Sequence, residues 1–177
     1  MEASTSYGER KEIRLPDGTQ LILNSCSRVC YPDRFADKER RVELEGEGYF
    51  RVYHNEKQPF IVNTRHFDVR VLGTCFNVKS YSSDEVVSVD VESGKVQVDL
   101  PEAMMRLRAK EQILINTVSG EYNKRYEERA VAVWRRGSLR FNSTPIRDVA
   151  KELERMYNCR ITSVSYTHLT LPTILRV

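Results

Sequence analysis

Three glutamates alternate along one short stretch and raise the question of acid–base chemistry. In "ELEGEGYF", Glu43, Glu45 and Glu47 lie two residues apart. In a strand, Glu43 and Glu45 would share one face, as the paired carboxylates of a glycoside hydrolase do. Arg40 and Arg41 precede them and can neutralise them, and the apolar residues between them place the carboxylates on the solvent side. A solvated strand face is therefore predicted, not a hydrolytic site.

Two glycines in the same stretch have the spacing of a phosphate-binding turn. Gly46 and Gly48 are separated by one residue, but no helical segment follows them. The N-terminus of a helix is what would bind the anion in such a motif. We therefore predict a β-bulge or a tight corner at these glycines.

The histidines do not indicate a metal centre. His54, His66 and His168 are widely separated and have no cysteine or carboxylate at ligand spacing. Neither a zinc site nor a cupin-like site can be assembled from them. We expect no metal and no cofactor.

The cysteines are predicted to be structural. Cys26 and Cys30 are four residues apart in strand-like sequence, which is roughly 13 Å if extended, whereas a disulfide tolerates Cα separations of about 4.4–6.8 Å. Cys75 follows Thr74 in an apolar stretch with no base in view, and Cys159 stands alone. We expect all four to be small buried hydrophobic residues, with no catalytic nucleophile among them.

Alternating apolar and polar residues are the main structural signal. "RVELEGEGYFRVYH" and "EVVSVDVESGKVQVDL" have a period of two, which is typical of half-buried antiparallel strands. Turn residues separate the strands at Pro16-Asp17-Gly18, Ser93-Gly94 and Ser119-Gly120. Strands recur about every 8–12 residues as far as Tyr126. The chain is therefore predicted to be mainly β, as an antiparallel sandwich, a barrel or a short β-solenoid.

Composition narrows the classes of partner. The chain has 177 residues, with 28 Lys and Arg against 25 Asp and Glu. The formal net charge of +3 is too small to argue for nucleic acid. No apolar run approaches the ~20 residues that cross a bilayer, and the N-terminus shows no secretory signal.

The pattern changes after Trp134, where strand-like and helix-like segments are predicted to follow one another. The stretch Leu139–Phe141 indicates a short strand, and another strand is predicted to begin at Cys159. Between them a helix is predicted to end near Asn158. Strand, helix and strand together would form a small βαβ-like unit.

The predicted helix has a cap, a proline start and an apolar arc. Ser143 or Thr144 would be its N-cap, with Pro145 at the first helical position. Its apolar residues fall within an arc of about 120°: Ile146, Val149, Ala150, Leu153, Met156 and Tyr157.

A basic stripe lies opposite that arc. Arg147, Lys151 and Arg155 recur every four residues, flanked by Asp148 and Glu152. Like charges at this spacing cost a few tenths of a kcal/mol each. The stripe is either a solvated face or a docking surface for an acidic partner.

Four ordered blocks of sequence resemble a known family. "LPDGTQLILNSCSRVCYPDRF", "RRVELEGEGYFRVYH", "KQPFIVNT" and "VRVLGTCFNVKSY" are similar to the periplasmic domain of FecR-family anti-sigma factors, of the form found in Bacteroidetes. The similarity extends from about Glu9 to Ile161. "VWRRGSLRFNSTPIRDVAKELERMYNCRI" resembles the tryptophan that closes the β-domain and the start of the family's C-terminal βαβ subdomain.

The resemblance implies a non-enzymatic protein that relays a signal. Such proteins cross the inner membrane once and hold an extracytoplasmic-function sigma factor through a cytoplasmic domain. Their periplasmic part senses the N-terminal signalling domain of a TonB-dependent outer-membrane transporter. "VRVLGTCFNV", which contains no reactive pair, would be scaffold.

The resemblance also implies a division of the chain. Residues 1–8 would be a linker after a missing membrane helix, residues 9–134 a FecR-like β-domain, and residues 135–162 a truncated C-terminal βαβ subdomain. The stretch Val164–Thr173, "VSYTHLTLPT", matches the translation of a DNA-sequencing adaptor. Residues 163–177 are therefore expected to be a non-native tail. Without its partners the subdomain's helix would keep a poorly covered apolar face.

The sequence departs from the family at two places. Where relatives often carry Asn-Ala-Gly-Ser, this chain has Asn24-Ser25-Cys26-Ser27, and Gly48 replaces a usual alanine. The first departure affects the backbone geometry of the turn that contains Cys26.

The expected partner-binding residues belong to the C-terminal part. We expect Leu139 and Phe141 to form a strand open to edge addition, with Arg147, Lys151 and Arg155 on an exposed helix face. One alternative is a carbohydrate-active or cupin-like β-protein, with a small-ligand site at Glu43, Glu45, His54 and His66. Another is an adhesive or structural β-domain.

Overall fold

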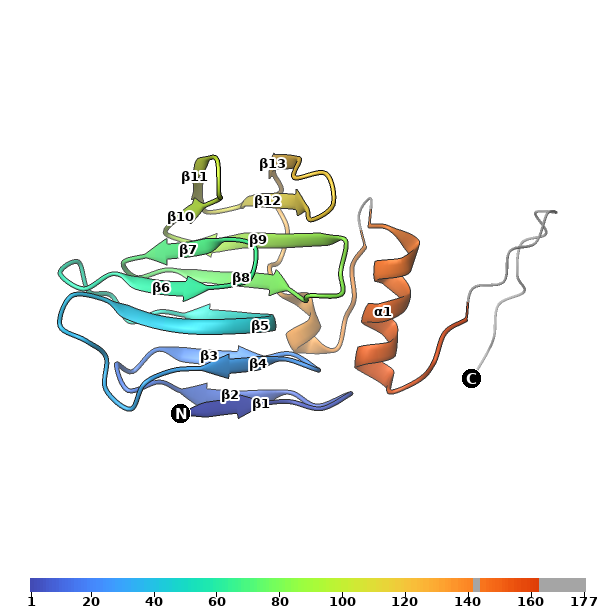
Figure 1. The fold of residues 1–177 in the computed structure, drawn as a ribbon, viewed down its shortest axis with the longest axis horizontal. Coiled ribbons are helices and arrows are strands. Elements are labelled where there is room, and N and C mark those ends of the chain that lie inside the picture. The colour runs from blue at the N-terminus through green and yellow to red at the C-terminus, as the bar shows by residue number, and fades with distance from the viewer. Residues whose placement is uncertain (142–143, 163–177) are drawn as a thin grey trace.

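The structure is a computed structural model that describes residues 1–141 and 144–162. It is mainly β, as the alternating pattern predicts. The described strands form one continuous hydrogen-bonded sheet that is folded into two layers joined through strand β5 (Figure 1). Phe50 in one layer lies 6.1 Å from Phe60 in the other, centroid to centroid, so the layers pack face to face as a sandwich.

The first layer has the strand order β1-β4-β5-β6-β7-β10-β11. The β5–β6 pair is parallel, and the other described pairs are antiparallel. The strands of this layer are β1 (Glu2–Ser4), β4 (Arg28–Cys30), the first half of β5 (Arg40–Arg51), β6 (Phe60–Asn63), β7 (Asp68–Val71), β10 (Lys95–Asp99) and β11 (Met104–Arg108).

The second layer has the strand order β2-β3-β5-β8-β9-β12-β13. The predicted turns at Asp17-Gly18 and Ser119-Gly120 close hairpins in this layer. Ser93-Gly94 instead passes the chain from β9 in this layer to β10 in the other. The strands are β2 (Lys11–Arg14), β3 (Gln20–Leu23), the second half of β5, β8 (Cys75–Ser80), β9 (Val86–Ser93), β12 (Glu111–Asn116) and β13 (Tyr122–Tyr126).

Strand β5 changes layer at Gly46, which confirms the predicted corner. Glu45 still pairs with Arg28 in the first layer, whereas Gly46 pairs with Ser80 in the second. Gly46 has φ of 103°, and a Cβ there would lie 2.4 Å from Ser27 Oγ. Only glycine tolerates both the backbone angle and the close approach of Ser27.

The core lies between the layers and comes from the inward positions of the alternating strands. The ring of Phe50 stacks on Phe76 at 5.3 Å. One charged residue, Arg40, is buried there, and its guanidinium pairs with Asp17 at 2.8 Å and lies over Phe60. Fully buried core residues include Leu21, Leu23, Val29, Val62, Val69, Val78, Val87, Val89, Val91, Val98 and Ile113.

The segment after β13 differs from the predicted strand–helix–strand order. It contains a 3-10 helix, η1 (Val133–Arg136), and one α-helix, α1 (Ile146–Tyr157). Residues Leu139–Phe141 and Cys159–Thr162 are not strands. Within the described residues, therefore, the predicted βαβ unit is represented by its helix alone. The adaptor-like tail, residues 163–177, lies outside the described part.

Helix α1 begins and ends close to its predicted limits. Pro145 is the N-cap and not the first helical residue, Thr144 gives no side-chain cap, and Ser143 is outside the described residues. Asn158 ends the helix in the left-handed conformation, with φ of 50°. Neither η1 nor α1 is long and apolar enough to cross a membrane.

Candidate functional site at the junction of the sandwich and helix α1

Helix α1 stands beside the strand ends of the sandwich (Figure 1), and polar side chains of the helix contact the segment that joins β8 to β9. Asp148, only 1% exposed, lies at the centre of this contact. Its carboxylate accepts hydrogen bonds from the backbone N–H groups of Glu85 and Val86, both at 2.9 Å. The first turn of α1 is therefore attached to the start of β9 by charge-assisted hydrogen bonds.

The last turn of α1 is held by a buried ion pair. The Arg155 guanidinium donates to both carboxylate oxygens of Asp84, at 2.8 and 2.9 Å. It also lies 3.7 Å from the ring centroid of Tyr81. The Asp84 side chain is fully buried, so the bidentate geometry compensates for the loss of water around two charges. We call this set, with Asp148, the polar latch: Tyr81, Asp84, Asp148 and Arg155.

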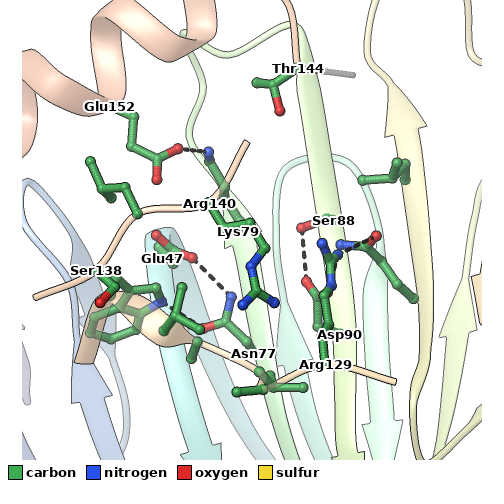
Figure 2. A pocket seen from close by; sticks show the side chains of 18 of the residues that line it. Glu47, Asn77, Lys79, Ser88, Asp90, Arg129, Ser138, Arg140, Thr144 and Glu152 are labelled. Atoms are coloured by element: carbon green, nitrogen blue, oxygen red, sulfur yellow. Dashed lines mark hydrogen bonds and ion pairs between the residues drawn. The ribbon is translucent and has the colours of Figure 1, made fainter. Parts of the chain in front are cut away.

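A lysine and two glutamates extend the charged contact into the second layer. Lys79 pairs with Glu152 on the helix and lies 3.9 Å from Asp84. Glu47 on β5 is buried, and burial raises the pKa of its carboxyl. It accepts hydrogen bonds from the amides of Asn24 and Asn77, at 2.7 and 2.9 Å. Figure 2 shows Glu47, Asn77, Lys79 and Glu152 around one recess.

The recess continues to a second carboxylate, Asp90. It receives hydrogen bonds from Ser88 and Gln112, and Arg129 lies 3.5 Å away (Figure 2). Burial raises the pKa of Asp90 to about 6. The cavity is about 120 Å³. The carboxylates of Glu47 and Asp90 both accept hydrogen bonds from neighbouring side chains. The recess is therefore a polar support for the segment that contains η1.

That segment closes the recess with a tryptophan. Trp134 in η1 is buried, and its indole N–H donates to the side-chain oxygen of Asn77 at 3.2 Å. Leu139 and Arg140 line the same recess. The chain between η1 and α1 is thus joined to the second layer by contacts of both polar and apolar kinds.

The start of the chain also touches the helix. The backbone N–H of Gly8 donates to the Arg155 carbonyl at 2.8 Å. Gly8 has φ of +70°, and a Cβ there would lie 3.3 Å from the Met156 carbonyl oxygen. Residues at both ends of the described chain therefore meet at the end of α1.

The structure corrects the prediction of an exposed basic stripe. Arg155 is buried in the polar latch, and Lys151 contacts the Ser83 carbonyl and lies 3.4 Å from Asp148. Arg147 alone of the three is solvent-exposed. The two like charges at positions 151 and 155 are explained by Asp148 and Asp84, which neutralise them.

The two predicted strand residues lie outside any strand. Leu139 is half-buried against the recess, and Phe141 is 37% exposed. Because the described chain has no strand there, Leu139 and Phe141 offer no strand edge for addition.

The apolar arc of α1 faces away from the sandwich. Ile146 and Tyr157 are 76% and 62% exposed, and Val149 and Leu153 are half-buried. The sequence predicted a poorly covered apolar face, and this face is observed within the described residues.

Sequence reasoning missed Tyr81, Asp84 and the role of Asp148. A usable signal was present on the helix, because one face carries the residues of alternating sign Asp148, Lys151, Glu152 and Arg155. Such a face can complement charges on another element. Its partner Asp84, however, is 71 residues away, beyond the reach of any local pattern.

The other candidate groups lie elsewhere. Glu45 pairs with Arg28 at 3.3 Å, so Arg40 and Arg41 do not neutralise it. Glu43 and Glu45 line one recess, whereas His54 lines a different groove. Glu47 was predicted to face solvent, but the structure shows that it is buried. Among residues 1–141 and 144–162, no three His, Cys, Asp or Glu side chains are grouped to hold a metal.

The cysteines are free but are not fully buried. Cys26, Cys30 and Cys75 are partly exposed, and Cys159 is exposed. The prediction of four buried residues was therefore wrong. Cys26 occupies the left-handed region, with φ of 54°, at the turn where the sequence departs from its family.

Comparison with known proteins identifies the family. Two crystal structures of a protein from Parabacteroides distasonis ATCC 8503, assigned as an anti-sigma factor and determined at 1.65 and 2.50 Å resolution, match the chain with 48% sequence identity and a TM-score of 0.85. Each match covers 89% of this chain and 75% of the other. No curated protein is significantly similar to the chain. Residues 1–97 match the family described as FecR protein, and the chain therefore belongs to the FecR family of anti-sigma factors.

Proposed function

We propose that this chain is the periplasmic signal-relay region of a single-pass inner-membrane regulator. In this proposal the region senses the N-terminal signalling domain of a TonB-dependent outer-membrane transporter. A preceding cytoplasmic domain would hold the extracytoplasmic-function sigma factor. Family membership supports a signalling regulator that binds a sigma factor.

The way in which helix α1 contacts the sandwich supports this proposal. Helix α1 is attached to the sandwich by charged and polar contacts, while Ile146 and Tyr157 of its apolar arc are exposed and the other residues of the arc are half-buried. Apolar surface on a helix is ordinarily the side that packs. The helix therefore joins two bodies: the sandwich on its polar side and another structure on its apolar side.

The chemistry of the junction suits a relay. A buried ion pair contributes little net stability compared with apolar packing, because desolvation of the charges opposes their attraction. Its geometry is nevertheless strict, since the guanidinium of Arg155 must meet both oxygens of Asp84. The polar latch thus specifies one arrangement of α1 while keeping the cost of rearrangement low.

The transporter contact is proposed at the exposed side of the C-terminal part. Tyr157, Phe141 and Arg147 are exposed there and supply aromatic surface beside a positive charge, the residue types that dominate protein interfaces. Leu139, Lys151 and Arg155 would act by positioning the segment and the helix.

Binding to a purified transporter signalling domain tests the proposal. We expect a pull-down to succeed with a version extended through the whole C-terminal subdomain and to be weak with residues 1–162. Tyr157→Asp in the extended version should weaken binding by about tenfold or more, because it places a charge in an apolar contact.

The matched control is Tyr126→Asp. Tyr126 is 66% exposed, close to the 62% of Tyr157, but lies on β13, so its change should leave binding unaffected. Equal tight binding by the short and extended chains would refute the assignment of the binding region. Equal loss in the two tyrosine variants would refute the helix contact.

A further inference from the structure

Four basic side chains on the first layer form no ion pair with an acidic side chain among residues 1–141 and 144–162, although Arg108 is close enough to Glu111 to lower the pKa of that carboxyl. They are Arg70 on β7, Lys95 on β10, and Arg106 and Arg108 on β11. None of the four forms an ion pair with a residue in the described part of the chain. By contrast, Arg41 on the same layer pairs with Glu39 and Asp68, at 3.0 and 3.5 Å.

The strand register gathers these four charges on one face. Gln97 pairs with Arg70 on one side and with Arg106 on the other. Lys95 pairs directly with Arg108. Because side chains alternate along a strand, these positions share the outer face of the layer, across neighbouring strands about 4.8 Å apart. Like charges directly opposite one another are destabilising, so this arrangement is not favoured by the stability of the sheet.

The four residues line a hollow of about 740 Å³, which we call the basic groove. Its size lies within the ~300–1,000 Å³ of typical ligand pockets. Val96 and Leu107 line it as well, together with Leu72, which is 43% exposed. Val96 and Leu107 are 2% and 1% exposed and line the groove from the core side, so the groove combines its positive charge with the exposed apolar side chain of Leu72.

The groove lies at the far end of strands β8 and β9 from helix α1. Thr74 and Gly94, at the start of β8 and the end of β9, line the groove. Ser83 and Val86, at the opposite ends of those strands, contact the helix. The basic groove is thus separate from the polar latch.

The edge of β11 is already occupied. The Arg106 carbonyl accepts a hydrogen bond from Lys124 at 2.9 Å, and the Arg108 N–H donates to the Glu111 carboxylate at 2.6 Å. Lys124 and Glu111 also pair with each other at 2.8 Å. A partner would therefore lie in the groove, held by side chains, and would not extend the sheet.

We propose that the basic groove binds an acidic, partly apolar peptide segment of another protein. Carboxylates of such a segment would pair with the guanidinium groups of Arg70, Arg106 and Arg108, while an apolar side chain of the segment would cover Leu72. The hollowed shape favours an extended chain over a flat anionic membrane. Glu56 also lines the groove. Its carboxylate would repel a continuous anionic surface such as a membrane, whereas a narrow peptide can bind without contacting it.

A fluorescent octapeptide that alternates glutamate and leucine tests the proposal by anisotropy with the full chain. We expect binding that weakens as salt rises from 50 to 500 mM, because salt screens exposed charges. A peptide with glutamine in place of glutamate should bind at least about tenfold more weakly. The triple variant Arg70→Gln/Lys95→Gln/Arg106→Gln should lose a similar factor.

A charge-matched variant controls for net charge. Arg34→Gln/Lys38→Gln/Arg136→Gln removes the same three charges from exposed positions outside the groove and should change binding by less than about twofold. If the groove variant melts early, the exposed Arg106→Gln alone should still weaken binding by about twofold to threefold.

Four results would overturn the proposal. One is absence of peptide binding by the unchanged chain. Another is equal weakening by the groove variant and its control. The third is binding to phosphatidylglycerol vesicles without binding to the peptide, which would make the groove a lipid-binding surface. The fourth is normal peptide binding by a groove variant that self-associates. That result would mean that the four charges only protect the sheet edge from pairing with another copy.

Discussion

The two-layer arrangement depends on the backbone at Gly46, where β5 passes from the first layer to the second. It combines φ of 103° with a position where a Cβ would overlap Ser27. Gly46→Ala should lower the free energy of unfolding by about 3 kcal/mol or more, because both backbone strain and overlap with Ser27 oppose it. Urea unfolding measures the change.

Gly18→Ala is the matched control for that change. Gly18 also has positive φ, 88°, but nothing lies within 4 Å of its Cβ direction. Backbone strain alone should cost about 1 kcal/mol there. Equal costs at Gly18 and Gly46 would show that contact with Ser27 is unimportant.

Asp90 makes stability depend on pH in an unusual direction. Its pKa rises from 3.8 to about 6 in the folded chain because of burial. Between these values the folded state binds the proton more readily than the unfolded state, so this residue's contribution to stability decreases as pH rises. Across the window the change is about 3 kcal/mol.

Asp90→Asn should remove that dependence. From pH 4 to pH 7 we expect the free energy of unfolding of the variant to rise relative to that of the unchanged chain, as measured by urea unfolding at each pH. Asp37→Asn, at an exposed carboxylate with no ion pair among the described residues, should follow the unchanged chain. A constant difference between Asp90→Asn and the unchanged chain would contradict the account.

At the scale of elements, helix α1 is held by charge and not by apolar packing. Asp84→Asn leaves the buried guanidinium of Arg155 without its carboxylate, which typically costs about 3 kcal/mol. The loss should appear as local opening of the helix, since α1 contacts the sandwich through this face.

Hydrogen exchange of the α1 amides measures this opening. In Asp84→Asn, amides of residues 146–157 should exchange roughly a hundredfold faster, as expected for about 3 kcal/mol, while strands β5 and β8 keep their protection. Arg147→Gln on the exposed side of the same helix should leave exchange unchanged. Unchanged exchange in Asp84→Asn would mean that the ion pair does not hold the helix.

The limits of sequence reasoning also appear at this scale. The alternation in β5, β9 and β10 was sufficient to predict strands, because burial of one face requires a period of two. The pairing of those strands was not predictable, since alternating strands have similar faces. The Ser93-Gly94 turn therefore looked like any chain reversal, although it connects the two layers.

The face by which helix α1 packs was also not predictable from the sequence. Its bounds followed from its apolar arc and from Asn158, but its basic face was predicted to be exposed and instead contacts the sandwich. Ordinarily the apolar side of a helix packs, and here the polar side contacts the sandwich. Only the distant residues Asp84 and Tyr81 explain the reversal, and their pairing with Arg155 depends on the complete fold.

At the scale of the whole molecule, the chain is a β-sandwich that carries two separate surfaces. The exposed side of helix α1 lies at one end of β8 and β9, and the basic groove lies at the other. In the proposed relay, the sandwich would hold these two surfaces apart.

The most direct measurement of the proposed relay is sigma-factor-dependent transcription in cells that carry the full-length regulator. With Tyr157→Asp, we expect that transcription no longer responds to the transporter's inducing ligand, whereas in cells with Tyr126→Asp it responds as with the unchanged regulator. A normal response in the Tyr157→Asp cells would contradict the claim that helix α1 receives the signal.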